Sequence, residues 1–162
     1  MKIFALLVAF FAAAFCAFGD AESWHQGPLP TNVHLLGHVG EEEKLRILSS
    51  SWLLVNTSIH EGLAISFLEA LSCEMPLLGC QDPEGIVSKF GIFVGRHEGS
   101  GMQGLPALIQ GLQRLLSDDQ MRLSLGKNGR SWVNATHSRS TFLASFRDLC
   151  AKAKLNANSL NP

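Results

Sequence analysis

Two glutamates, Glu61 and Glu69, lie eight positions apart, and Gly62 directly follows the first. Apolar residues at helical spacing fill the interval, and apolar runs end just before it and begin just after it. This order predicts a strand, a glycine-bearing loop, the start of a helix and a second strand. If the helix begins near Leu63, the offset spreads the two carboxylates over about 12 Å, at a rise of about 1.5 Å per residue.

The space between these carboxylates suits one class of ligand. The first amides of a helix lack intrahelical partners, and the helix dipole adds about half a positive charge there, so this end attracts anions. A ligand with hydroxyl groups at both ends and phosphate in the middle, such as a nucleotide-sugar, fits this arrangement. The alternative is an ordinary helix with one glutamate favoured by the dipole and a second that faces solvent. The spacing alone does not separate the two.

The elements that would position these residues alternate between strands and helices. We expect strands at Val33–Leu36, Trp52–Val55, Pro76–Gly79 and Ile92–Val94. The motif helix begins near Leu63, and the other expected helices are Glu41–Leu48, Glu84–Phe90, Leu105–Ser117, Asp118–Asn128, Gly129–Thr136 and Ser140–Ala153. Such alternation predicts an α/β fold, a Rossmann-like parallel sheet with flanking helices. Ligands on these sheets bind at the carboxyl ends of the strands, where Asn56–Gly62 and Cys80–Gly85 fall.

The residues around the glutamate pair belong to a longer pattern. Its parts are Ser58–Gly62, Glu69-Ala70, Cys73 and Pro76, the preceding Asn32–Val39, and the following Asp82–Val87 and Gly91–Val94. Together they resemble the E-x7-E signature and its surroundings in the donor-binding C-terminal domain of retaining glycosyltransferases of the family-4 type, which have the GT-B fold. The resemblance covers residues 30–150, approximately.

The resemblance implies a role for each residue of the motif. Glu61 would contact hydroxyls of the transferred sugar at the catalytic centre, and Glu69 would accept the two ribose hydroxyls of the nucleotide. An ionised carboxylate offers only acceptors, which suits a diol that donates. The backbone of Gly62, Leu63 and Ala64 would face the diphosphate, and Gly62 would permit its close approach.

The same resemblance implies how the reaction proceeds. The donor would be a nucleotide-diphosphate sugar, and the diphosphate leaving group would assist the incoming hydroxyl on one face of the sugar, with retention. The protein would orient the groups and stabilise charge. We expect no metal ion or other cofactor, because the sequence has no DxD triplet and no Cys/His cluster at zinc spacing.

Four polar residues lie near the motif, and Ser58, His60 and Glu84 each allow more than one interpretation. Ser58 either reaches a phosphate or caps the turn, or it is simply a loop hydroxyl. His60 is a possible acid or base, and the alternative is a loop histidine packed beside the motif. Asp82 and Glu84 lie in a loop that often lines the same pocket in relatives. Glu84 is a binding candidate, against the alternative of a carboxylate that starts a helix.

Three departures from the family pattern bear on function. A GT-B enzyme has two Rossmann-like domains, and this chain has room for only part of the second. The family's Arg and Lys that neutralise the diphosphate lie upstream of the motif, where this chain offers Lys2, and Lys44 and Arg46 on an ordinary helix. Glu74 stands where relatives often have Gly, which tightens the demands of that turn.

Two hypotheses of different classes therefore remain. The chain is either the donor-binding half of a glycosyltransferase that acts with an N-terminal acceptor domain or a partner chain, or a non-catalytic nucleotide-sugar-binding or structural module. The 162 residues are 46% hydrophobic and 17% charged with a formal net charge of −1, which fits one globular domain and gives no basic excess for nucleic acid. Cys73 and Cys80 flank a predicted buried strand, and we expect them to be small core residues.

The N-terminal segment has Lys2 followed by the apolar run Ile3–Phe18 and then small residues. This predicts that residues 1–19 are signal-peptide-like; the alternatives are an uncleaved membrane anchor through residues 1–18 and a mistaken gene start. The protein would enter the secretory pathway or associate with a membrane if the signal is genuine, and would otherwise be cytoplasmic. We expect a linker at residues 20–31, a glycosyltransferase C-terminal-like domain at 32–154 and a disordered tail at 155–162.

Overall fold

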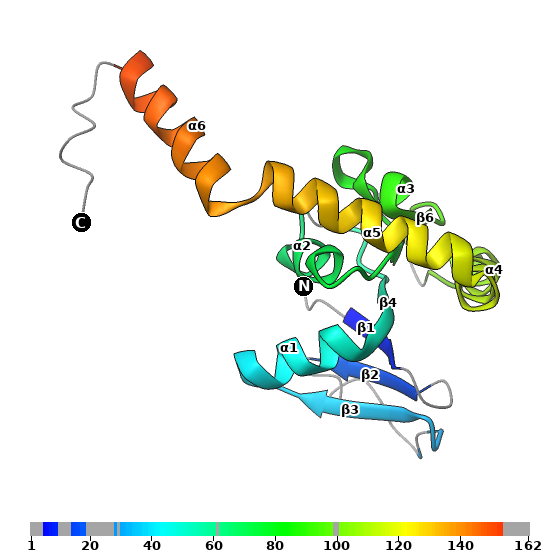
Figure 1. Ribbon diagram of the computed structural model, residues 1–162. Coiled ribbons are helices and arrows are strands. Elements are labelled where there is room, and N and C mark those ends of the chain that lie inside the picture. The colour runs from blue at the N-terminus through cyan, green and yellow to red at the C-terminus, as the bar shows by residue number, and fades with distance from the viewer. Residues whose placement is uncertain are drawn as a thin grey trace.

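A six-stranded sheet forms the centre of the fold (Figure 1). The computed structural model describes residues 5–9, 14–18, 28, 30–60, 62–98 and 101–153. The strand order is β3-β2-β1-β4-β5-β6. Strands β4 (Ser51–Asn56), β5 (Leu77–Gly79) and β6 (Gly91–Phe93) are parallel, and helices flank them. The α/β class and the Rossmann-like parallel sheet are thus confirmed.

Two strands come from the N-terminal interval. β1 (Ala5–Ala9) and β2 (Ala14–Phe18) lie between β4 and β3 (Val33–Gly37). β1 pairs antiparallel with both β4 and β2, whereas β2 and β3 are parallel. The sheet therefore extends beyond the predicted domain bounds of 32–154 into the interval 1–19.

The export and localisation predictions concern this same interval and stay predictions. Within the described parts of the chain, no helix has both the length and the apolar character needed to cross a membrane. The remaining residues of the interval, most of the predicted linker at 20–31 and the predicted tail at 155–162 lie outside the described residues.

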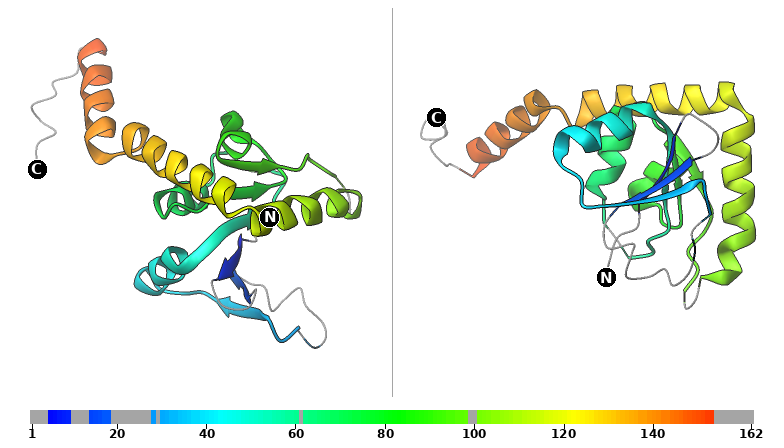
Figure 2. Two further views of the ribbon diagram at one scale, coloured as in Figure 1. Left: turned by 45° about the vertical axis from the view of Figure 1, so that its right-hand side comes forward. Right: turned by 90° about the horizontal axis from the view of Figure 1, so that it is seen from below.

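The core is divided by the central strand. Leu53 and Val55 point to one face of the sheet and Leu54 to the other, and all three are buried. α1 (Glu41–Ser50), α2 (Ile65–Ser72) and α3 (Ile86–Phe90) pack on the Leu54 side, and α4 (Leu105–Ser117) packs on the other. α5 (Asp119–Thr136) contributes to both clusters, because it runs past the end of the sheet from one side to the other (Figure 2). α6 (Arg139–Lys152) projects away from this body (Figures 1 and 2).

α5 corrects one prediction. We expected two helices, with the second beginning at Gly129, but residues 119–136 form a single helix. Its glycines are sites of close contact: a Cβ on Gly126 would lie 1.9 Å from the carbonyl oxygen of Glu74, and one on Gly129 would lie 2.5 Å from Cδ2 of Leu71. Glu74 itself has φ +60°, the left-handed region that favours glycine, in agreement with the tight turn expected there.

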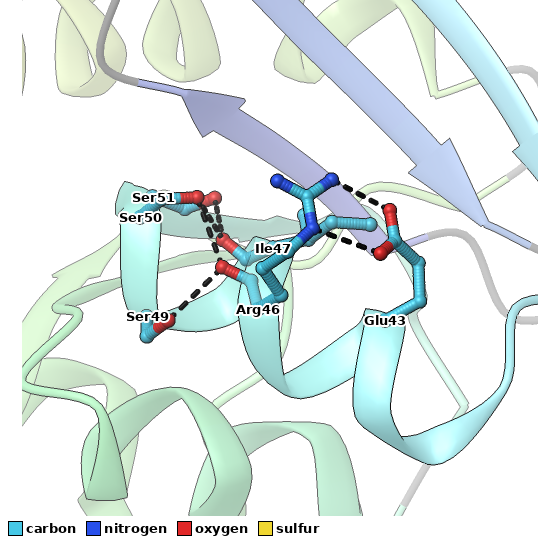
Figure 3. Close-up of polar contacts among 6 residues, drawn as sticks. All are labelled: Glu43, Arg46, Ile47, Ser49, Ser50 and Ser51. Atoms are coloured by element: carbon cyan, nitrogen blue, oxygen red, sulfur yellow. Dashed lines mark hydrogen bonds and ion pairs between the residues drawn. The ribbon is translucent and has the colours of Figure 1, made fainter.

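α1 leads into β4 without an intervening residue. The hydroxyls of Ser50 and Ser51 both donate to the carbonyl of Ile47, at 3.0 and 2.7 Å (Figure 3). The Ile47 carbonyl lies in the last turn of α1, where carbonyls lack an intrahelical amide donor, and the two hydroxyls take the place of that donor. The hydroxyls therefore allow the chain to turn sharply into the buried strand.

Candidate functional site

Three loops at the carboxyl edge of the parallel strands meet around one hollow. They follow β4, β5 and β6, as the rule for such sheets predicts. The hollow has a volume of about 680 Å³. The described residues of its wall are Ile59, His60, Gly62, Gln81, Asp82, Pro83, Phe93 and Arg96.

Backbone contacts at Asn56 and Gly79 hold these loops together. The amide of Cys80 donates to the carbonyl of Asn56 at 3.1 Å, and the amide of Val94 donates to that of Gly79 at 3.0 Å. The side chain of Asn56 is fully buried, and its Oδ1 accepts a hydrogen bond from the amide of Ser58 at 2.8 Å. Its Nδ2 has no hydrogen-bond partner within the described part of the chain. The side chain of Asn56 therefore holds the backbone of Ser58, and the role of the Ser58 hydroxyl stays a prediction.

A cation enters this hollow from the third loop. Arg96 Nη2 lies 3.0 Å from Nδ1 of His60 and 3.2 Å from Oε1 of Glu98. Because a guanidinium only donates, Nδ1 of His60 is the acceptor in this hydrogen bond. From the sequence, no helix or strand is predicted between Val94 and Leu105, and Arg96 was not singled out. Its place directly after a parallel strand was the signal that could have found it.

The loop after β5 is organised by Asp82. Its Oδ1 accepts hydrogen bonds from the amides of Val87 at 2.8 Å and Ser88 at 3.0 Å, and its Oδ2 accepts one from the Ser88 hydroxyl. Asp82 thus satisfies free amides at the start of α3. Glu84 is exposed, has φ +54° and lies in a 3-10 turn at Pro83–Gly85, so α3 begins only at Ile86 and not at Glu84 as predicted.

The motif helix begins later than predicted. α2 starts at Ile65, with Ala64 in extended geometry before it, and no side chain caps this end. Leu63 packs against the core, and this burial keeps Gly62, Leu63 and Ala64 in the loop instead of the first helical turn. Glu61 lies outside the described residues, so its role and its separation from Glu69 stay predictions.

Glu69 belongs to α2, and its side chain contacts α1. Its Oε1 is 2.8 Å from Nζ of Lys44, which also lies 2.9 Å from Oε2 of Glu41. The hydrogen bonds to Glu69 and then to Glu41 raise the pKa of Lys44 above its usual value. These residues line a second hollow of about 390 Å³, and no described residue belongs to both this wall and that of the hollow at the strand ends. The structure therefore brings Gly62 together with the Asp82 loop and Arg96, and places Glu69 with Lys44.

The two upstream cations on α1 differ in their surroundings. Arg46 forms a fork with Glu43 on the surface, with Nε–Oε2 at 2.8 Å and Nη2–Oε1 at 2.6 Å (Figure 3). Lys44 instead reaches a residue of the motif, 25 positions further along the chain. The sequence carries no local signal for this pairing, because it depends on how α1 packs beside α2.

A third hollow of about 410 Å³ adjoins the strand ends and shares Ile59 with the first. Its wall includes Cys80, His97, Met102 and Leu105. Burial raises the pKa of the Cys80 thiol, which favours the neutral thiol. Cys80 therefore behaves as a half-buried apolar side chain, close to the core residue we expected.

The chain was compared with known families and proteins. A family model described as "Glycosyl transferases group 1" matches residues 22–132. A Xenopus tropicalis protein named "Glycosyltransferase 1 domain-containing protein 1" is 23% identical over 128 residues, which cover 78% of this chain and 35% of that relative. The chain thus spans about a third of the relative's length. Because the family model covers more than half of the chain, this protein belongs to the group 1 glycosyltransferases.

Proposed function

We propose that this domain binds a nucleotide-diphosphate sugar and forms the donor half of a retaining glycosyltransferase of the GT-B type. The acceptor would be held by a second domain or a partner chain. No metal ion or other cofactor is required in this proposal, because side chains and backbone amides supply the contacts to the donor. The donor's sugar and base are left open.

One observation carries the proposal: the loops after three parallel strands converge on a single hollow that contains Gly62 and Arg96. This is the edge at which α/β sheets bind nucleotides. A glycine on the wall allows a phosphate to approach the backbone closely, and an arginine offers charge-assisted hydrogen bonds to it.

The residue roles follow the family pattern. Glu61 would contact the transferred sugar, and Glu69 the ribose hydroxyls. Oε1 of Glu69 contacts Nζ of Lys44 at 2.8 Å, and a carboxylate has further lone pairs that can accept hydrogen bonds from a diol. The backbone of Gly62, Leu63 and Ala64 would lie along the diphosphate. Ser58 and Glu84 are chain neighbours of wall residues and would make secondary contacts from there.

A second candidate is a non-catalytic nucleotide-sugar-binding or structural module. The observation that favours it is the position of Glu69, which lines a different hollow from Gly62 and already has a cationic partner. In that case the ion pair with Lys44 only joins α1 to α2.

Titration with nucleoside diphosphates separates a donor-binding site from a purely structural module. We expect UDP, GDP or ADP to bind the full chain in calorimetry and to shift amide resonances of the loops after β4, β5 and β6. Glu69→Gln should weaken this binding about tenfold or more, because a hydrogen bond to a charged group contributes about 1.5–3 kcal/mol. Glu43→Gln is the matched control, since Glu43 also pairs with a cation of α1 but lies outside the three hollows.

The outcomes are distinct. Binding that is lost in Glu69→Gln and kept in Glu43→Gln supports the donor-binding site. Absence of binding by all three nucleotides at millimolar concentration contradicts the proposal and supports the structural module.

A further inference from the structure

A donor diphosphate needs positive charge, and the two cations of α1 are already engaged. Arg46 is paired with Glu43, and Lys44 contacts both Glu69 and Glu41. Backbone amides carry only partial charges, so a diphosphate held by them alone would be bound weakly. The hollow at the strand ends therefore requires another cation if it is to hold such a group.

Arg96 is positioned to supply that charge. It is the only Lys or Arg among the residues identified on the wall of this hollow, which it shares with Gly62 and His60. Its side chain is 48% exposed, so it remains accessible to a ligand. The contacts to His60 and Glu98 both use Nη2, one of three guanidinium nitrogens.

We propose that Arg96 is the residue of this chain that neutralises the diphosphate of the donor, in place of the upstream cations that do so in the family. The inference rests on the proposed function. His60 acts as a positioning residue, because its Nδ1 lies 3.0 Å from Nη2 of Arg96 and holds the guanidinium at the wall of the hollow. Glu98 is a competing anion: its side chain is 73% exposed, and a diphosphate that reaches Arg96 replaces it as the partner.

Removing the charge is the first test. Arg96→Gln should weaken binding of UDP, GDP or ADP, whichever binds the wild-type chain, about ten- to a hundredfold, while binding of the corresponding nucleoside is unchanged. Inorganic pyrophosphate should displace the nucleotide from the wild-type chain and do so less well from the variant. Arg96→Lys keeps the charge but not the planar fork, and it should fall between the two. Circular dichroism and the melting temperature establish that each variant is folded.

The matched control is Arg130→Gln. Arg130 is 53% exposed and pairs with a single carboxylate, Glu74, at 3.1 Å, as Arg96 pairs with Glu98 at 3.2 Å. Arg130 belongs to α5 and does not line any of the three hollows. We expect Arg130→Gln to bind nucleotides as the wild-type chain does.

Removing the competitor gives a result of opposite sign. Glu98→Gln should tighten binding of the nucleoside diphosphate by up to about fivefold, which is the size of an exposed ion pair. A purely structural role of the Arg96–Glu98 pair would not produce this gain.

The failures of the two proposals can be told apart. If the wild-type chain binds a nucleoside diphosphate and Arg96→Gln binds it equally well, the role of Arg96 is refuted and the proposed function stands. Equal weakening of nucleoside and nucleotide by Arg96→Gln also refutes it, because the contact is then not to phosphate. If the wild-type chain binds none of the nucleotides, both proposals are overturned.

Discussion

Replacing Gly126 with alanine tests how α5 holds the motif helix in place. The new Cβ would lie 1.9 Å from the carbonyl oxygen of Glu74, whereas ordinary contact begins at 3.4 Å. The helix and the turn after α2 must therefore separate by about 1.5 Å, or distort to the same extent. The obstacle is backbone, so no side-chain rotation relieves it.

The magnitude follows from two opposing effects. Overpacking of a core typically costs about 1–3 kcal/mol, and a contact with backbone belongs at the upper end of that range. Alanine is favoured over glycine inside a helix by about 1 kcal/mol. The net expectation is that Gly126→Ala lowers the free energy of unfolding by about 2 kcal/mol, or the melting temperature by about 4–8 °C for a domain of this size.

Urea unfolding followed by far-UV circular dichroism measures this change, with the transition midpoint and slope fitted together. Gly129→Ala is the matched control on the same helix. The three atoms nearest its Cβ all belong to the side chain of Leu71, with Cδ2 at 2.5 Å, and a side chain can shift more easily than a backbone carbonyl. We expect it to cost less than half as much. If Gly126→Ala is as stable as the wild-type chain, or more stable, the close packing of α5 on the Glu74 turn is wrong.

Three further predictions concern single side chains. Lys44→Met should lower the free energy of unfolding by about 1 kcal/mol or less, since the ion pair with Glu69 is partly exposed. Because the ion pair raises the pKa of Lys44, its stabilisation is present below the ordinary lysine pKa of about 10.4 and is lost as the pH rises through the higher folded value. Urea unfolding of the wild-type chain and of Lys44→Met, at pH 7 and above pH 10.4, checks this. A difference in unfolding free energy between the two proteins that grows with pH would contradict it. Asp82→Ala should cost about 1–2 kcal/mol, because the amides at the start of α3 lose their acceptor; an unchanged melting temperature would disprove the capping role. Cys80 should react with iodoacetamide more slowly in the native chain than in urea at pH 8, since burial raises the pKa of its thiol; equal rates by mass spectrometry would exclude the buried environment.

Much of the parallel sheet could be predicted because its signals are local. Continuous apolar runs at Trp52–Val55 and around Leu77 fit strands covered on both faces, and the helix at Leu105–Ser117 has the predicted bounds. Gly129 was misleading for a physical reason. Glycine lowers helix propensity, but in α5 it is needed for contact with another element, which only the tertiary structure reveals.

The site was less predictable, because its contacts join distant residues. The start of α2 is shifted by the packing of Leu63 against the core, which outweighs the local preference for a helix. The pairing of Lys44 with Glu69 and of Arg96 with His60 spans 25 and 36 positions, respectively. Charge and spacing along the chain identify such residues as candidates, but only the packing of α1 and the order of the strands selects their partners.

The position of β1 has a consequence for the fate of the N-terminal interval. Its residues Ala5–Ala9 hydrogen-bond along the whole of β4, the strand from which both halves of the core extend. A protease that removed residues 1–19 would remove β1. It would leave β4 as an edge strand whose backbone amides and carbonyls on that side have no strand partner. Exposed edge strands of this kind pair with strands from other molecules. Removal of residues 1–19 would therefore turn a central strand of the sheet into an edge strand that is open to pairing with another chain.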